Sequence, residues 1–345
     1  MKAARLHAIG DFRIDEVEIP KITGEQLLVK VGACGICGSD LPRVYQLGTS
    51  NKHYPLTIGH EFSGEIMDVG PDGDKSLIGK KGAFFPLIPC MKCDMCNQKE
   101  YVLCEDYDYM GSRRDGAFAE YIVVPSSWHF VETKNNASFT SLAMCEPCSV
   151  AGHATNMGQI KENDFVAIFG AGPIGIMAAR WCLIKKAKPI IFDIMDEKIE
   201  FAKQRGIDAY NSAKENCAEI VKNINNGKLA DVAIEGTGAG SALGNCIECL
   251  RRKGNLVLMG NPFSDTQIKL SQHSLILRKE LVVRGIWNSH FPDEWQTTVE
   301  KIDNGEMIVE DLITHTCSID GVVDLFDKIH NKEICICKAM YVNGE

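Results

Sequence analysis

The chain of 345 residues lacks three features that would place it in a specialised class of protein. It has no run of basic residues and a formal net charge of −9, so it offers no electrostatic footprint for nucleic acid. Its first residues lack the apolar run and cleavage site of a secretory signal, which predicts a cytoplasmic protein. Its most apolar stretch, VAIFGAGPIGIMAARWCLI, is interrupted by glycine, proline and Arg180, which argues against a membrane span. We therefore expect a small-molecule partner.

The sequence also shows no internal repeat and no low-complexity segment, which leaves an ordinary globular protein. Cysteine is abundant, however, with fifteen residues scattered through the chain. An odd number of thiols without an export signal argues against a disulfide framework. We expect these cysteines to be reduced and to serve as metal ligands or core residues.

Apolar residues follow two different patterns in the two parts of the chain, which predicts an α/β protein of two domains. Up to about residue 145, short alternating segments such as EQLLVKV and EFSGEIMDVG are separated by glycine and proline, which indicates a mainly β domain. From about residue 165, apolar strands such as FVAIF, KPIIFDI and DVAIEG alternate with helices, which indicates a doubly wound parallel sheet. We assign residues 149–288 to this second domain, and 1–148 with 289–345 to the first.

The segment FVAIFGAGPIG carries a G-x-G-x-x-G motif directly after a strand and at the start of a helix. Gly170 permits a tight turn, Gly172 lets the backbone approach a pyrophosphate, and Gly175 allows close helix packing. Asp193 ends the next strand, where a carboxylate can bond the ribose 2′-OH; no arginine follows it to hold a 2′-phosphate, so NAD is favoured over NADP. A glycine turn without a ligand is the alternative. The predicted cofactor-binding residues are Gly170, Gly172, Pro173, Ile174, Gly175 and Asp193.

Residues 89–105 hold four thiols with the spacing C-x2-C-x2-C-x7-C. Short spacings of this kind let one loop surround a tetrahedral ion, which predicts a closed structural zinc site. Redox-active or unrelated thiols are the alternative. The predicted ligands are Cys90, Cys93, Cys96 and Cys104.

Three separated fragments offer a second set of metal ligands: Cys37 in CGSD, His60 with Glu61 in GHEFSGE, and Glu146 in CEPCS. Sulfur, nitrogen and carboxylate ligands suit a zinc ion with an open coordination position. Spacing alone does not show that these residues meet, and an isolated His-Glu pair is often structural.

These fragments, the four-cysteine segment and the later glycine motif resemble the zinc-dependent medium-chain alcohol and polyol dehydrogenases over essentially the whole chain. The resemblance rests especially on CGSDLPR, YPLTIGHEFSG, GSRRDGAFAEYIVV and LRKELVVRGIWNS. It implies a GroES-like catalytic domain, a Rossmann NAD-binding domain between its two segments, an active-site cleft between the domains, and a homodimer or homotetramer. It also implies two zinc ions per chain. The catalytic ligands would be Cys37, His60 and Glu61, with Glu146 bound directly or through water.

The resemblance further implies that zinc lowers the pKa of a bound hydroxyl before hydride passes to the nicotinamide. Many relatives carry a proton-relay histidine five residues after the cysteine that matches Cys37, but here that position is Pro42. Ser39 can still accept the substrate's proton. Glu61, Glu146 or water could receive it next.

The guanidinium groups of Arg43, Arg113 and Arg114 could each donate two hydrogen bonds to a phosphate group. This suggests a sugar-alcohol phosphate as substrate. The resemblance implies that the reaction is oxidation of galactitol 1-phosphate to tagatose 6-phosphate. The alternatives are an unphosphorylated polyol or diol such as sorbitol, xylitol or butanediol, and a non-catalytic zinc-stabilised protein that binds NAD. An arginine pair bound to nearby acids such as Asp115 is the simpler interpretation of the motif GSRRDG. The candidate substrate residues are Arg43, Arg113, Arg114, Trp287 and Asn288.

Overall fold

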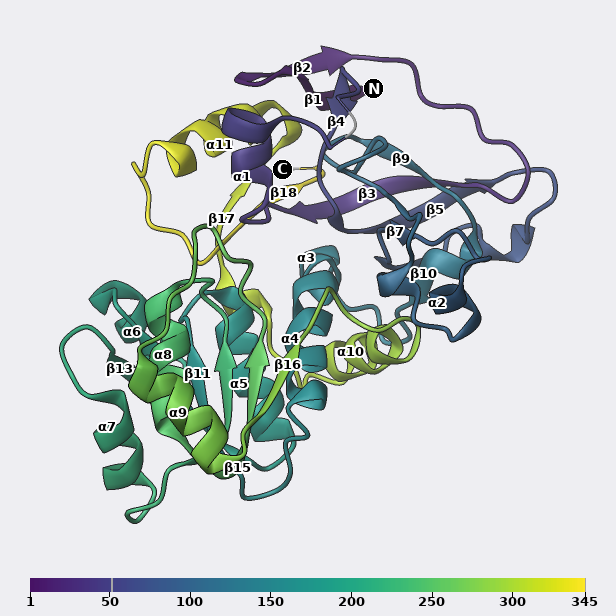
Figure 1. Ribbon diagram of the computed structural model, residues 1–345. Helices are drawn as coiled ribbons and strands as arrows, with labels where there is room; N and C mark the ends of the chain where they lie inside the picture. Colours follow the sequence, from purple (N-terminus) through teal and green to yellow (C-terminus); the bar gives the residue numbers. More distant parts are fainter. Residues whose placement is uncertain (51, 345) are drawn as a thin grey trace. The chain divides into compact units, whose positions relative to one another are not determined.

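The computed structural model describes residues 1–50 and 52–344, which form two compact units (Figure 1). The first unit comprises Met1–Glu146 and His290–Glu345, and the second comprises Pro147–Ser289. The second unit is thus an insertion in the sequence of the first. Within the described residues, no helix combines the length and apolarity needed to cross a membrane.

The first unit is built on mainly antiparallel sheets, with one parallel pair between its last two strands. Its largest sheet has the strand order β10-β6-β5-β3-β18-β17, with β9 also paired to β3; a second sheet has the order β2-β1-β4, and β7 pairs with β8. The strands are β1 (Lys2–Ala8), β2 (Asp11–Glu16), β3 (Leu27–Gly35), β4 (Leu56–Thr57), β5 (Glu61–Val69), β6 (Lys81–Phe84), β7 (Leu87–Ile88), β8 (Asp108–Tyr109), β9 (Tyr121–Val124), β10 (Phe130–Glu132), β17 (Ile313–Cys317) and β18 (Lys338–Val342).

Short helices connect these strands. They are α1 (Asp40–Pro42), the π-helical turn η1 (Arg43–Leu47), α2 (Asp94–Asn97), α3 (Phe139–Ala143), α10 (Asp293–Asp303) and α11 (Val322–His330). Single 3-10 turns are η2 (Lys75–Leu77), η3 (Tyr101–Leu103), η4 (Ser127–His129), η5 (Glu310–Leu312) and η6 (Ile319–Gly321). Helix α4 (Cys145–Met157) begins at the end of the first unit and continues into the second.

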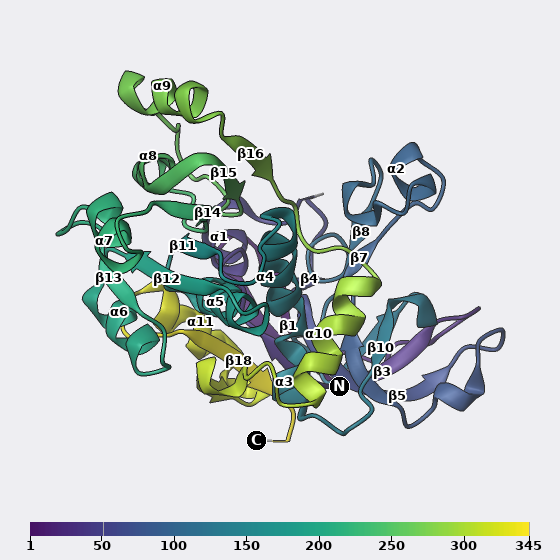
Figure 2. The same cartoon turned by 90° about the horizontal axis from the view of Figure 1, so that it is seen from below.

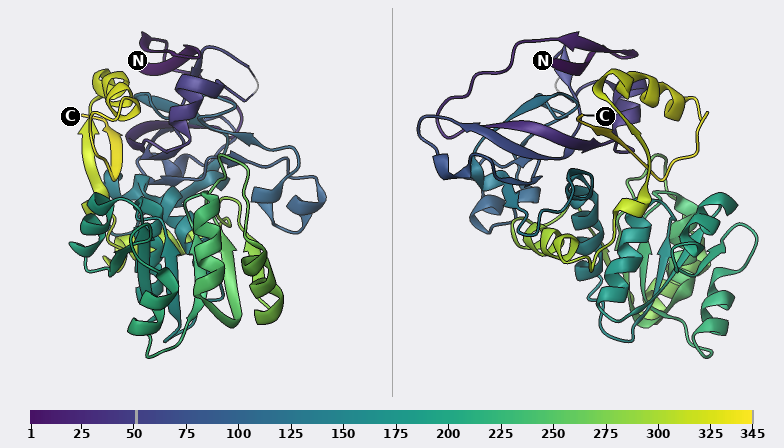
Figure 3. Two further views of the ribbon diagram at one scale, coloured as in Figure 1. Left: turned by 60° about the vertical axis from the view of Figure 1, so that its left-hand side comes forward. Right: turned by 180° about the vertical axis from the view of Figure 1, so that it is seen from behind.

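The C-terminal segment completes the core of the first unit. Helix α11 packs beside the N-terminal strands, as the two views of Figure 3 show. Its Phe326 is fully buried, with its ring 4.9 Å from that of Phe12 and 5.5 Å from that of Phe118. Strand β18 pairs with β3 on one side and with β17 on the other. Residues far apart in the sequence therefore form one hydrophobic core.

The second unit contains a parallel sheet with the order β13-β12-β11-β14-β15-β16, the doubly wound order expected for a dinucleotide-binding fold. All five residues of its central strand β11 are buried, as is typical of a parallel strand covered on both faces. Helices α7, α8 and α9 cover one face, and α5 and α6 cover the other (Figure 2). The strands are β11 (Phe165–Phe169), β12 (Lys188–Asp193), β13 (Ala209–Asn211), β14 (Ala230–Glu235), β15 (Leu250–Leu258) and β16 (Val282–Gly285). The helices are α5 (Pro173–Ile184), α6 (Asp196–Lys203), α7 (Cys217–Ile224), α8 (Gly240–Cys249) and α9 (Leu270–Lys279).

This architecture confirms the predicted α/β class. Helix α6 has Met195 as its N-cap, and Asp196 is its first residue. Asp196 accepts a hydrogen bond from Asn211 (2.7 Å) and pairs with Lys214 (2.5 Å). The carboxylate is therefore engaged by residues beyond the helix.

Candidate metal and cofactor sites

The ends of two paired strands bring three candidate metal ligands together. Cys37 follows β3, His60 directly precedes β5, and Glu61 is the first residue of β5. The two strands are antiparallel, with Gly35 opposite Glu61, so the end of one meets the start of the other. One ligand atom from each of Cys37, His60 and Glu61 lies within 4.8 Å of the others. Sulfur, nitrogen and oxygen donors thus converge on one point.

Asp40 orients two of these ligands from a fully buried position. One of its carboxylate oxygens accepts a hydrogen bond from the Cys37 amide (3.0 Å), and the other lies 3.5 Å from Nδ1 of His60. Burial alone would lower the pKa of His60, but the charges of Asp40 and Cys37 outweigh burial and raise it well above its usual value. The site therefore has an excess of negative charge that a cation would balance.

Lys338 supplies a buried positive charge to Glu61. The ammonium group donates to the Glu61 carboxylate, and both side chains are almost fully buried. Gly35 makes this contact possible, because a β-carbon at position 35 would clash with both side chains. The ammonium group of Lys338 therefore holds the Glu61 carboxylate in place. This is typical of the outer shell around a metal site.

Glu146 lies at the first turn of α4 and is buried, but it is not among the three residues whose ligand atoms converge. Burial raises its pKa to about 7, with smaller effects from His60 and Glu61. A carboxyl group with such a pKa can exchange a proton near neutral pH.

The three converging donors fit a catalytic zinc ion better than a structural one. Catalytic zinc sites use three protein ligands and keep a further position for water or substrate, whereas structural sites are closed by four. His60 Nδ1 and the facing Asp40 oxygen are buried and make no hydrogen bond with proper geometry to the described residues. Their positions suit a histidine whose other nitrogen binds a metal.

The second cluster has the geometry of a closed zinc site. Sγ of Cys90 lies 4.0 Å from that of Cys96, and Sγ of Cys93 lies 3.9 Å from that of Cys104. A tetrahedral ion with zinc–sulfur bonds of about 2.3 Å requires sulfur separations of about 3.8 Å. Backbone N–H groups of Cys96 and Glu105 lower the pKa of Cys93 to about 6, while burial raises that of Cys96 to about 12. A bound divalent cation would stabilise thiolate ligands.

The glycine motif of the second unit forms a turn that leaves room for a ligand. A β-carbon at Gly175 would overlap with the carbonyl of Gly170, so this glycine is required by the fold. At Gly172, a β-carbon would meet no atom of the described residues within 4 Å. The turn therefore leaves open space beside Gly172, at the N-terminus of α5.

Asp193 ends β12 beside this turn. One carboxylate oxygen accepts a hydrogen bond from the Ala171 amide (2.8 Å), and the other accepts from Ile194 (2.8 Å) and Met195 (3.0 Å). These bonds fix the carboxylate next to the glycine turn and leave lone pairs for a hydroxyl group. The remaining motif residues, Pro173 and Ile174, open helix α5.

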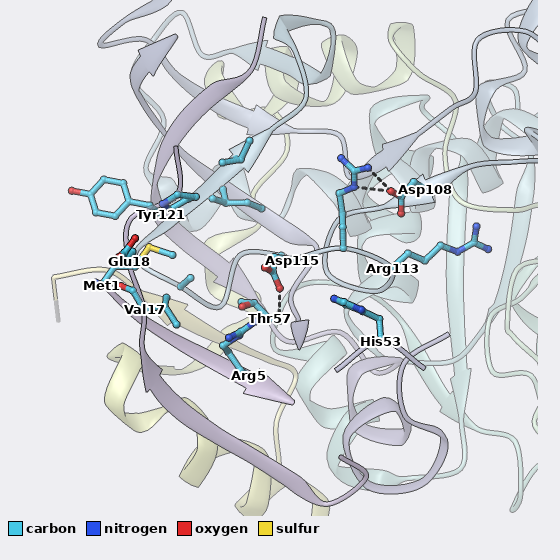
Figure 4. A pocket seen from close by; sticks show the side chains of 16 residues that line it. Met1, Arg5, Val17, Glu18, His53, Thr57, Asp108, Arg113, Asp115 and Tyr121 are labelled. Carbon is cyan, nitrogen blue, oxygen red and sulfur yellow. Dashed lines mark hydrogen bonds and ion pairs between the residues drawn. The ribbon is translucent and has the colours of Figure 1, made fainter. Parts of the chain in front are cut away.

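The structure separates the candidate substrate arginines into two groups. Arg114 is bound to Asp108, with its Nε and Nη2 each 2.6 Å from one carboxylate oxygen (Figure 4). Arg113 donates to the carbonyl of Tyr107, and its guanidinium lies 4.0 Å from the centre of the Tyr107 ring. Both arginines line a pocket of about 610 Å³ that also contains Glu18. Of the two, Arg114 fits the interpretation of an arginine bound to a nearby acid.

Arg43, by contrast, lies in η1 one turn beyond Ser39. Ser39 donates a hydrogen bond to the sulfur of Cys37 (3.2 Å), which places its hydroxyl beside the metal ligands. Trp287 is half exposed after β16, and Asn288 has a positive φ of 57°. Both belong to the second unit.

Sequence reasoning missed two residues of the metal site. Asp40 follows Cys37 by three positions inside CGSD, a local signal that could have indicated an orienting carboxylate. Lys338 lies 277 positions from Glu61, and its only sequence signal is a charged residue within the apolar segment ICICKAMYV.

Comparison with known proteins identifies the family. Residues 23–134 match the alcohol dehydrogenase GroES-like domain, and residues 173–304 match the zinc-binding dehydrogenase domain. The chain is 34% identical to galactitol 1-phosphate 5-dehydrogenase of Escherichia coli strain K12, with 93% of this chain and 94% of that protein covered. It is 31% identical to sorbitol dehydrogenase of Bacillus subtilis, with 99% and 98% covered.

The fold agrees with these sequence matches. The crystal structure of galactitol-1-phosphate dehydrogenase from Escherichia coli superposes with a TM-score of 0.92 at 32% identity, covering 99% of this chain and 100% of that one. The chain therefore belongs to the zinc-dependent medium-chain alcohol and polyol dehydrogenases, oxidoreductases that act on small molecules with zinc and a nicotinamide dinucleotide.

Proposed function

We propose that this protein oxidises a secondary alcohol of a sugar-alcohol phosphate with NAD, and that galactitol 1-phosphate is converted to tagatose 6-phosphate. The observation that carries the proposal is the convergence of Cys37, His60 and Glu61, which offers three ligands and leaves a coordination position for a substrate hydroxyl. The similarity to galactitol 1-phosphate 5-dehydrogenase supports the choice of substrate.

When bound by Cys37, His60 and Glu61, zinc would act as a Lewis acid that lowers the pKa of the substrate hydroxyl. Asp40 and Lys338 hold the ligands in position, through the Cys37 amide and the Glu61 carboxylate. Such preorganisation reduces the rearrangement needed when charge develops on the substrate oxygen.

Ser39 is the residue we assign to accept the substrate's proton, because its hydroxyl lies 3.2 Å from the sulfur of Cys37. Pro42 occupies the position of the relay histidine in many relatives and cannot carry the proton onward. Of the two carboxylates nearby, Glu61 is held by Lys338, whereas Glu146 has a pKa of about 7. We therefore assign Glu146, directly or through water, to the later proton exchange.

NAD rather than NADP is the proposed cofactor. The carboxylate of Asp193 would bond the ribose 2′-OH, and a 2′-phosphate would face its negative charge. Lys214 is paired with Asp196, so this pair adds no net positive charge to hold a 2′-phosphate. Replacing Asp193 with serine should lower kcat/KM for NAD and raise it for NADP. Unchanged preference would contradict this assignment.

Substrate choice is tested by comparing kcat/KM for galactitol 1-phosphate and sorbitol with NAD, using protein with measured zinc content. A higher value for the phosphorylated polyol, and two zinc ions per chain, would support the proposal. Oxidation of sorbitol alone would favour the second candidate, an unphosphorylated polyol or diol dehydrogenase. That candidate is favoured by the similarity to sorbitol dehydrogenase and by the engagement of Arg114 with Asp108.

A non-catalytic zinc-stabilised protein that binds NAD is a third candidate, and it is disfavoured by the converging ligands. One zinc ion per chain with no nicotinamide reduction would support it. We place the reaction in the cytoplasm, where the fifteen cysteines would stay reduced.

We also propose that the protein is a homodimer or homotetramer. Strand β16 is at the edge of the parallel sheet, and its Val282 and Val283 are 40% and 44% exposed. Exposed edge strands with apolar side chains are typical sites of strand pairing between chains. Analytical ultracentrifugation of the Val283→Lys variant should show a smaller species than the wild type.

A further inference from the structure

A small pocket beside Ser39 combines two positive charges with hydroxyl groups. It has a volume of about 400 Å³ and is lined by Ser39, Arg43, residues 47–50 and Lys52. No carboxylate is among these lining residues, although the whole chain has a net charge of −9. The pocket therefore attracts anions within an otherwise acidic protein.

The guanidinium of Arg43 has unused hydrogen-bonding capacity. Its Nε is buried and has no hydrogen-bond partner among the described residues. Its Nη1 lies 3.5 Å from the hydroxyl of Ser50, at the outer limit of a hydrogen bond. A buried donor without a partner is costly, so such a group indicates an acceptor that binds there.

The local backbone fixes this arginine next to the reacting centre. Ser39 is the N-cap of α1, and Arg43 begins the π-helical turn that follows directly. Residues four apart lie on the same side of a helix, so Arg43 lies one turn beyond the hydroxyl that contacts Cys37. The amide of Lys52 donates to the carbonyl of Thr49 (3.2 Å), which closes the loop that carries the second cation.

The other candidate arginines lack these properties. The fork of Arg114 is already filled by Asp108, and Arg113 donates to Tyr107 and stacks on its ring. Their pocket also contains several carboxylates, which would repel a phosphate dianion. The charge and hydrogen-bonding arguments therefore both favour Arg43.

We propose that the pocket of Arg43 and Lys52 binds the terminal phosphate of the substrate, while the alcohol to be oxidised lies at Cys37 and Ser39. The inference rests on the proposed function, which it deepens by naming the residues that distinguish a polyol phosphate from a free polyol. Arg43 provides a bidentate fork, and Lys52 provides a point charge at the pocket wall. Both are specificity residues and take no part in hydride transfer.

The test compares galactitol 1-phosphate with galactitol in the zinc-loaded wild type and in the Arg43→Gln, Lys52→Ala and Arg114→Gln variants. The ratio of kcat/KM for galactitol 1-phosphate to that for galactitol should fall about 10- to 100-fold in Arg43→Gln. Loss of a hydrogen bond to a charged group weakens binding by about this factor. A smaller fall is expected for Lys52→Ala, whose exposed side chain can be removed without disturbing the fold. Arg114→Gln is the matched control and should leave the ratio unchanged.

Binding of inorganic phosphate provides a readout that does not depend on turnover. Isothermal titration should detect phosphate binding to the zinc-loaded wild type and its weakening by a similar factor in Arg43→Gln. Circular dichroism of each variant would show whether it is folded. If Arg43→Gln does not fold, Lys52→Ala must still weaken phosphate binding for the inference to stand.

The outcomes separate this inference from the proposed function. Suppose that the wild type oxidises galactitol 1-phosphate, but that Arg43→Gln and Lys52→Ala lower kcat/KM for both substrates by the same factor. The proposed function then stands and the phosphate pocket is wrong. If the wild type oxidises only free polyols, the phosphorylated substrate is wrong. In that case, phosphate binding that depends on Arg43 would still support an anion pocket here, and its absence would overturn it.

Discussion

The buried ion pair between Glu61 and Lys338 leads to a prediction that distinguishes charge compensation from packing. Methionine at position 338 would keep most of the apolar stem and remove the charge. In the metal-free protein, the Glu61 carboxylate would then remain buried, at 2% side-chain exposure, without its counter-charge. Removing one partner of a buried pair costs about 3–5 kcal/mol. For a unit of this size, the melting temperature should fall by roughly 6–20 °C.

Zinc should offset much of this loss. A divalent cation held by Cys37, His60 and Glu61 provides the positive charge that Lys338 otherwise supplies, so the carboxylate is compensated in either variant. We expect the difference in melting temperature between wild type and Lys338→Met to shrink to about half or less after zinc is restored. Binding linked to folding produces this dependence on metal.

The assay is thermal unfolding by calorimetry or circular dichroism, with each protein stripped of metal and then reloaded. Lys338→Arg is the control, because it keeps the positive charge at a similar position. Both variants retain the four-cysteine cluster, so loss of its metal affects them equally. If Lys338→Met is destabilised by the same amount with and without zinc, Lys338 acts through packing and the argument from charge is refuted.

Three further predictions concern the cofactor turn and the two metal sites. Gly172→Ala should weaken NAD binding, measured by fluorescence titration, while leaving stability nearly unchanged. Gly175→Ala should instead lower stability, because its β-carbon would overlap with the Gly170 carbonyl. Because the folded pKa of Glu146 is about 7 and its ordinary value is 4.5, the folded state of the metal-free protein holds a proton that the unfolded state releases. The wild type should thus lose about 3 kcal/mol of stability between pH 4.5 and 7 relative to Glu146→Gln, seen in urea unfolding; parallel pH profiles would contradict this. Cys104→Ser should reduce the zinc content, measured by mass spectrometry, from two ions to one, and an unchanged content would exclude the four-thiolate site.

Features encoded over a short stretch of sequence were accessible without a structure. The glycine motif and the four-cysteine segment each place their residues within one turn or loop, so spacing alone constrains their geometry. The doubly wound sheet was likewise visible, because each strand carries its own apolar run. Strand β13 escaped detection, since its three residues are too few to show a periodicity.

Features that depend on tertiary contacts were not accessible. Lys338 reaches Glu61 only because β18 pairs with β3, and β3 pairs with β5. The engagement of Arg114 by Asp108 was one of two open interpretations of GSRRDG, and composition could not decide between them. The unused donor of Arg43 is likewise a property of burial, which a sequence pattern does not report.

The position of β18 in its sheet has a consequence for biosynthesis. The end of β3 that leads to Cys37 pairs with β18, whose residues are synthesised long after those of β3. At 5–20 residues per second, roughly 15–60 s separate the synthesis of these partners. During that interval the nascent chain carries an unsatisfied strand edge, so a molecular chaperone that shields exposed β edges would increase the yield of active enzyme.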